Sequence, residues 1–125
     1  MSLRETLRSA LASRDEVAAD EERRVAALQT GTTPVSRLRS RRRATVTGVL
    51  RSVVLRPADR VQAVEAELFD GSGSVDLVWL GRRRIAGIEP GRRARAEGLV
   101  SDVKGRHVMF NPRYELLAGE VPDVD

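Results

Sequence analysis

Between residues 44 and 110 the chain alternates between apolar and polar positions with the two-residue period that is typical of β-strands. The first of these segments is rich in β-branched residues, which favour strands. Gly48 interrupts it, and a glycine within a strand marks a bend or bulge of the kind that a small barrel needs to close. The alternation predicts five strands, at residues 44–55, 61–69, 74–80, 92–100 and 107–110.

The segments between the strands have the composition of turns. Asp-Gly-Ser-Gly at 70–73 predicts a hairpin turn, and Lys104-Gly105 predicts the tip of a second hairpin. Between the third and fourth strands, Ile85 and Ile88 are spaced for one short helical turn that plugs the core. This order of elements predicts a mainly β fold, the five-stranded Greek-key barrel called the OB-fold, with a short helical plug between strands 3 and 4. An SH3-like barrel, which lacks the plug, is the second choice.

Alternation within each strand also predicts which side chains fill the core. Trp79 alternates with Val75 and Leu77, so we expect it to point inward. Tyr114, next to Asn111 and Pro112, is expected to clamp the end of the barrel. The expected core comprises Val46, Leu50, Val64, Ala66, Leu68, Val75, Leu77, Trp79, Ile85, Ile88, Leu99 and Val108.

The pattern before residue 30 is different. Leu3, Leu7 and Leu11 are four residues apart, which predicts helix over residues 2–29, as one helix or two, with Gly31 as its stop. The apolar stripe is thin, so we expect this helix to lean on the barrel or on a second copy of the chain. The chain thus divides into a helical extension (residues 1–30), a basic linker (31–42), the barrel (43–117) and an acidic tail (118–125).

Charge is unevenly distributed. The net charge is +4, yet residues 36–60 carry +7 and residues 82–113 carry +6, with an acidic stretch of −4 between them. All but one of the 22 basic residues are arginine, the exception being Lys104. Arginine suits phosphate because its planar guanidinium donates two parallel hydrogen bonds, although coding bias in a G+C-rich genome also raises the arginine content. The two basic blocks favour a nucleic-acid partner.

Several functional classes are excluded by composition. The chain has no cysteine and a single histidine, His107, which rules out disulfides, thiolate metal sites and His-rich metal sites. No nucleophile with its base and no phosphate-binding glycine loop is recognisable, so we expect neither an enzyme nor a cofactor. No apolar run is long enough for a membrane span and no signal-peptide core is present. We therefore expect a cytoplasmic protein without membrane contact.

One stretch resembles a known family. Residues 69–80 read Phe-Asp-Gly-Ser-Gly-Ser-Val-Asp-Leu-Val-Trp-Leu, followed by Glu-Pro-Gly-Arg-Arg at 89–93, Glu-Gly-Leu-Val at 97–100 and Asn-Pro-Arg-Tyr-Glu-Leu at 111–116. In this order and spacing, over roughly residues 43–117, they resemble the OB-fold wedge domain of RecG-type branch-migrating helicases. The helicase motor segments are absent. The resemblance implies a free-standing nucleic-acid-binding OB-fold, but Leu80 stands where the family has an aromatic residue that stacks on a base.

The expected contact residues follow from these points. Glu65, Glu67 and Asp76 face outward on strands 2 and 3, where they would repel phosphates, so the basic loops are the better candidates. We expect a protein that binds nucleic acid, DNA rather than RNA, in DNA repair or recombination; the alternative is a protein-interaction adaptor, or self-association, through residues 2–29. The candidate nucleic-acid-binding residues are Arg51, Arg56, Arg60, Phe69, Arg82, Arg83, Arg84, Arg93, Arg95, Lys104 and Arg106.

Overall fold

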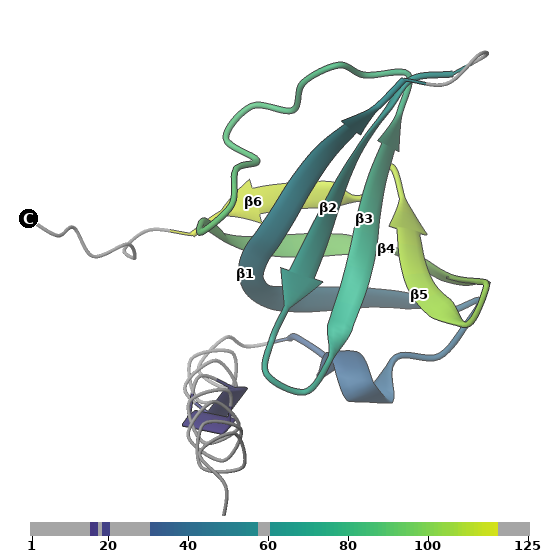
Figure 1. Cartoon of the computed structure of the whole chain (residues 1–125). Coiled ribbons are helices and arrows are strands. Elements are labelled where there is room, and N and C mark those ends of the chain that lie inside the picture. The colour runs from purple at the N-terminus through teal and green to yellow at the C-terminus, as the bar shows by residue number, and fades with distance from the viewer. Residues whose placement is uncertain (1–15, 18, 21–30, 58–60, 118–125) are drawn as a thin grey trace, which may run out of the picture.

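The computed structural model of the chain describes residues 16, 17, 19, 20, 31–57 and 61–117. This part is mainly β, as the alternation predicts (Figure 1). A 3-10 helix, η1 (Val35–Arg37), precedes six strands: β1 (Arg43–Arg56), β2 (Ala63–Phe69), β3 (Ser74–Leu80), β4 (Arg93–Val103), β5 (Arg106–Phe110) and β6 (Arg113–Leu116). Most of the helix expected over residues 2–29 lies outside the described residues, as does the acidic tail; positions 16, 17, 19 and 20 are helical.

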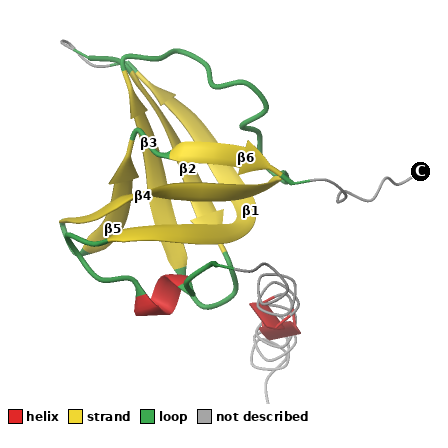
Figure 2. Cartoon of the chain, turned by 180° about the vertical axis from the view of Figure 1, so that it is seen from behind, coloured by secondary structure: helices red, strands yellow, loops and turns green. Residues whose placement is uncertain are grey.

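Five of the strands form a ring of hydrogen-bonded neighbours in the order β1-β2-β3-β5-β4, which β1 closes by pairing with β4. All neighbours are antiparallel except β3 and β5, which run parallel. Strand β1 reaches both sides of the closure because its first half, Arg43–Val49, pairs with β4 and its second half, Val49–Arg56, pairs with β2. The sixth strand, β6, was not expected from the sequence. It pairs with β4 along the edge opposite to the one that pairs with β1 (Figure 2).

Gly48 lies where β1 passes from one partner strand to the other. A Cβ atom at this position would stand 2.3 Å from the carbonyl oxygen of Phe69, so the two strands approach more closely than any side chain allows. The extra residue of the bulge is Arg51, between Leu50 and Ser52 in the pairing with β2. Gly48 therefore lies at the point where β1 changes partner, and the bulge follows three residues later.

Inward-facing side chains fill the ring, and all but one of the expected core residues are buried. The prediction for Leu99 is wrong, because its side chain is 48% exposed. Ala96 and Val100 point inward from β4, so the strand period turns Leu99 outward. Val108 is buried as expected, but in a separate small cluster with Ala63 and Val78.

The helical plug predicted between strands 3 and 4 is also wrong. Residues 81–92 form a loop without helix, in which the N–H of Ile88 donates to the carbonyl of Ile85 at 3.1 Å and closes a single turn. It is a β-turn and not a turn of helix, because Gly87 within it has a φ of +75°, a left-handed conformation that a right-handed helix does not contain. Ile85 and Ile88 nevertheless insert into the core as the spacing predicted.

Trp79 and Tyr114 hold one end of the ring together. The indole N–H of Trp79 donates to the carbonyl of Pro112 at 3.1 Å, and the two rings meet edge to face with centroids 5.6 Å apart. The hydroxyl of Tyr114 donates to the carbonyl of Ala86 at 2.8 Å, which ties β6 to the loop after β3. Both residues therefore have the structural roles that the sequence predicted.

Candidate nucleic-acid interface

The outer face of β2 and β3 carries the acidic side chains that the sequence placed there, and two of the three are neutralised. Nε of Arg56 lies 2.8 Å from Oε1 of Glu65. Arg106 donates from Nε and Nη2 to both oxygens of Asp76, at 2.8 and 2.9 Å. These hydrogen bonds, and then the charge of Asp76, raise the pKa of Arg106 above its usual value. The face is thus less repulsive to phosphate than its carboxylates alone indicate.

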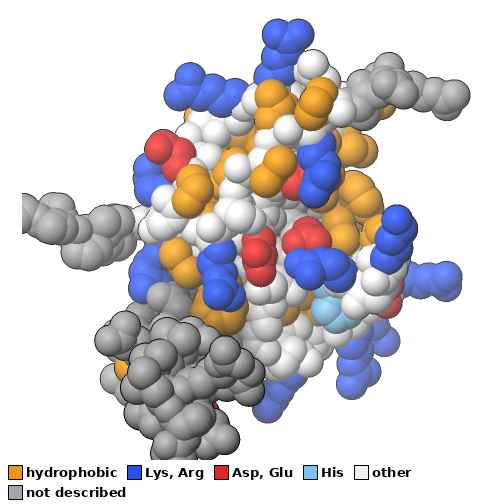
Figure 3. Space-filling view, in the orientation of Figure 1, with side chains coloured by type: hydrophobic (Ala, Val, Ile, Leu, Met, Phe, Trp, Pro, Cys, Tyr) orange, Lys and Arg blue, Asp and Glu red, His pale blue; other side chains and the backbone are white. Residues whose placement is uncertain are grey.

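Lys and Arg side chains surround this face, as Figure 3 shows, with acidic side chains near its middle. At one end, Arg82–Arg84 are exposed at the start of the β3–β4 loop. Strand register places Arg56 opposite Ala63, and Ala63 opposite Leu80, so Arg56 lies at this same end. The structure therefore brings together four of the expected contact residues, from two distant segments of the chain, at what we call the arginine end of the ring: Arg56, Arg82, Arg83 and Arg84.

Gln62, which directly precedes β2, forms two hydrogen bonds with the start of the β3–β4 loop. The N–H of Gly81 donates to the carbonyl of Gln62 at 2.6 Å, and Nε of Arg83 donates to the Gln62 side chain at 3.0 Å. Arg82 and Arg84 have no ion-pair partner in the described part of the chain. Their guanidinium groups are therefore available to an anion from solution.

A groove of about 660 Å³ opens beside Arg82. Its apolar part includes Leu80, which is 44% exposed, while the side-chain oxygen of Asn111 accepts the Leu80 N–H at 2.9 Å. The groove is lined by Trp79, Leu80, Arg82, Ile85, Asn111, Pro112, Arg113 and Tyr114. It thus combines an apolar floor with two arginines, one from the β3–β4 loop and one from β6.

Phe110 is a candidate that the sequence analysis missed. Its backbone lies opposite Val78 in the β3–β5 pairing, and its side chain is 44% exposed. The strand period could have identified Phe110, because successive residues of a strand point to opposite faces and the preceding residue, Met109, is buried in the core. Phe110 and Leu80 place apolar surface on the outside of the ring, close to the arginine end.

At the opposite end of β5, Lys104 and Gly105 form the hairpin tip with positive φ values of 51° and 81°. The Asp102 carboxylate next to it accepts a hydrogen bond from the Ser40 hydroxyl and lies 2.8 Å from Nδ1 of His107. The Ser40 hydrogen bond, followed by the contact with His107, lowers the pKa of Asp102 below its usual value. Because Asp102 lies between the serine and the histidine, His107 cannot take the proton of Ser40, and the group is not a catalytic triad.

Two other expected residues are engaged with each other. The guanidinium of Arg51 lies 4.1 Å above the ring centroid of Phe69, a cation–π contact on the outside of β1 and β2. The ring of Phe69 is therefore covered on one face by an arginine of the chain itself.

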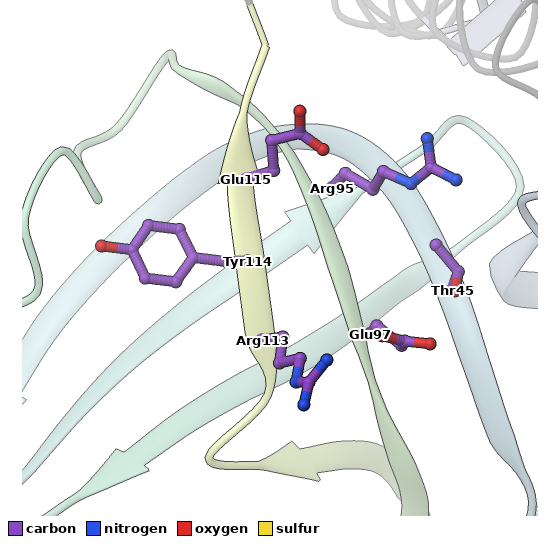
Figure 4. A pocket seen from close by; sticks show the side chains of 6 residues that line it. All are labelled: Thr45, Arg95, Glu97, Arg113, Tyr114 and Glu115. Carbon is purple, nitrogen blue, oxygen red and sulfur yellow. The ribbon is translucent and has the colours of Figure 1, made fainter.

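Arg93 and Arg95 are not brought to the arginine end, because they lie on β4. A cavity of about 240 Å³ there is lined by Thr45, Arg95, Glu97, Arg113, Tyr114 and Glu115 (Figure 4). Arg95 is paired with Glu115 and Arg113 with Glu97 in the strand register, so charges of opposite sign face each other. The side chain of Tyr114 points away from this group (Figure 4). Arg60 lies outside the described residues.

The described residues contain neither a cluster of metal ligands nor a helix that could span a membrane. No three His, Cys, Asp or Glu side chains gather there as a metal site would require. None of the helical segments in the same ranges is long and apolar enough to cross a bilayer. No protein-family model matches the chain, and neither does any curated protein sequence.

Proposed function

We propose that the chain is a nucleic-acid-binding OB-fold protein that contacts phosphates through arginine, with DNA as its partner. The observation that carries the proposal is the arginine end of the ring, where Arg82 and Arg84 have no ion-pair partner in the described residues. Carboxylates elsewhere on the same face are neutralised by Arg56 and Arg106. A planar guanidinium binds phosphate, as it binds carboxylate, with two parallel hydrogen bonds.

The topology supports the OB-fold part of the proposal. The ring order β1-β2-β3-β5-β4 joins five strands through a long, bent β1 that is shared between two partners. In OB-folds, the outer face of strands 2 and 3 and the loops 1–2 and 4–5 hold the ligand. Arg56 at the first of these loops and Lys104 at the second bracket the same face here. This arrangement also agrees with the resemblance to the RecG-type wedge domain and with a role in DNA repair or recombination.

Binding of this kind draws its free energy from phosphate contacts and from the counterions that they release. Phosphates carry no base sequence, so affinity should be uniform across sequences. Leu80 and Phe110 add exposed apolar surface beside the arginines, against which an unpaired base can pack. The proposal therefore predicts affinity that falls steeply with salt and varies little with base composition.

The test is the anisotropy of labelled oligonucleotides at several salt concentrations. Replacing Arg82, Arg83 and Arg84 together by Gln should lower the slope of log K against log salt by roughly 0.7–0.9 for each charge removed. The side chains are exposed, so the melting temperature should stay unchanged. Gln replacements of Arg93 and Arg95 on β4 provide a comparison for charge loss on another face.

Two results would contradict the proposal. Equal losses per charge in the two variants would mean that the arginine end is not the contact surface. An absence of binding by the wild type at about 50 mM salt, where phosphate contacts are strong, would remove the proposal altogether. The arginine content would then reflect coding bias, and the adaptor hypothesis would take first place.

A further inference from the structure

The segment before β1 carries the densest positive charge of the chain. Five arginines fall within seven residues, and all five are exposed. The sequence alone suggests a basic linker, but the structure holds this segment against the ring. We call the five side chains the arginine ridge: Arg37, Arg39, Arg41, Arg42 and Arg43.

The N-terminal side of the ridge is fixed by two buried side chains, Val35 and Leu38, which belong to the main core. Backbone groups are fixed as well, since the N–H of Val35 donates to the buried Asp70 carboxylate at 2.9 Å. The N–H of Ser36 donates to the Ser72 hydroxyl at 3.0 Å. The turn between β2 and β3 therefore holds η1 in place.

The C-terminal side of the ridge is fixed to β4. The N–H of Arg41 donates to the carbonyl of Val100 at 2.7 Å, and the N–H of Val100 donates to the carbonyl of Arg42 at 2.9 Å. The Ser40 hydroxyl donates to Asp102, and Arg43 already belongs to β1. The backbone of the ridge is thus fixed at both ends. The five arginine side chains therefore extend from a backbone that is held in place.

The charges of the ridge are not neutralised. Within the described ranges, none of its five guanidinium groups has an ion-pair partner. The two acids that bind this segment, Asp70 and Asp102, are engaged with backbone N–H groups, hydroxyls and His107. Holding five like charges together is unfavourable, and a polyanion offsets that repulsion.

We propose that the arginine ridge is a second nucleic-acid-binding surface, separate from the arginine end, and that its ligand is the phosphate backbone of a duplex. This inference rests on the proposed function. The choice of a duplex follows from the side chains present. Residues 31–43 contain no aromatic residue, so the ridge lacks the aromatic platform on which the bases of a bound single strand usually stack. A duplex keeps its bases inside and displays phosphates, which a surface of arginines contacts without reading sequence.

The experiment compares two variants that lose the same charge. One carries Arg37→Gln, Arg39→Gln and Arg42→Gln, and the other carries Gln at Arg82–Arg84. Each is titrated with a labelled duplex and with a labelled single strand of equal length. The ridge variant should lose on the order of tenfold in duplex affinity at low salt, its slope falling by about 0.9 per charge, while its single-strand affinity changes by less than about twofold.

Two further variants separate charge from folding. Lysine at the same three ridge positions keeps the charge, so it should retain the salt slope of the wild type. Ser40→Ala removes the hydrogen bond to Asp102 without changing charge, so it should weaken duplex binding and leave the slope unchanged.

The outcomes distinguish the two proposals. If the wild type binds neither probe, both the proposed function and the proposal for the ridge are wrong. A wild type that binds, with a ridge variant of unchanged duplex affinity and slope, overturns the ridge alone. Equal losses on duplex and single strand overturn the duplex preference, and binding to phosphatidylserine vesicles without binding to the duplex overturns the choice of nucleic acid as its ligand.

Discussion

Replacing Trp79 by Ala tests the packing of the core more sharply than any other single change. The side chain is only 5% exposed and lies against Tyr114 with an edge-to-face geometry. Its indole N–H is bonded to the carbonyl of Pro112, whose residue is also buried. The substitution therefore removes apolar burial, an aromatic contact and a hydrogen bond at once.

The expected loss follows from these three contributions. Truncating a buried tryptophan to alanine costs about 3–5 kcal/mol in free energy of unfolding. The aromatic contact accounts for about 0.5–1.5 kcal/mol of that, and the hydrogen bond for about 1 kcal/mol. We expect a total near 4 kcal/mol, which lowers the melting temperature by roughly 15–30 °C. Trp79→Phe, which keeps a ring and loses the N–H, should cost about 1–2 kcal/mol.

The measurement is urea denaturation followed by far-ultraviolet circular dichroism, because Trp79 is the only tryptophan and its fluorescence disappears with it. Leu80→Ala is the matched control, since the neighbouring Leu80 side chain is 44% exposed and should cost under about 1 kcal/mol. If Trp79→Ala costs no more than Leu80→Ala, the indole does not occupy the core and the end of the ring is packed differently.

Two other predictions concern stability. Gly48→Ala should cost about 1–3 kcal/mol, because the new Cβ would stand 2.3 Å from the Phe69 carbonyl oxygen. Gly98→Ala is the control, because Gly98 has no positive φ and its new Cβ would meet its nearest atom only at 3.4 Å, so it should change the stability by less than about 1 kcal/mol; equal thermal shifts would contradict the close approach at Gly48. The pKa of Asp102 is lowered in the folded state, so its stabilising contribution is present above about pH 4 and is lost as the pH falls further. The difference in melting temperature between wild type and Asp102→Asn should therefore shrink as the pH is lowered below about 4, and a difference that stays constant with pH would refute this prediction.

The alternation of the sequence predicted most of the strands, since a half-buried strand leaves a mark every second residue. Where it failed, the reason is local. Leu99 is apolar, but the period of β4 was already set by Ala94 and Ala96, and the structure follows the period rather than the residue type. The plug failed because the sequence shows two isoleucines at helical spacing, whereas Gly87 between them adopts a positive φ.

The candidate site was predicted only as a list of arginines. The sequence does not reveal that Arg56 and Arg106 are paired with carboxylates, because Glu65 and Asp76 lie on other strands. Nor does it reveal which arginines share a face. Those facts depend on strand register, which long-range pairing decides.

By itself, the sequence determined the mainly β character, the two hairpin turns and the burial of Trp79, because each depends on near neighbours along the chain. Only the tertiary structure decided that β1 pairs with two strands and that β3 and β5 run parallel. It also decided that Val35 and Leu38 pack into the core and so fix the arginine ridge against the ring. These contacts join residues that are far apart in sequence. Their free energy comes from burial and hydrogen bonds that exist only once the ring has closed, and no local pattern records them.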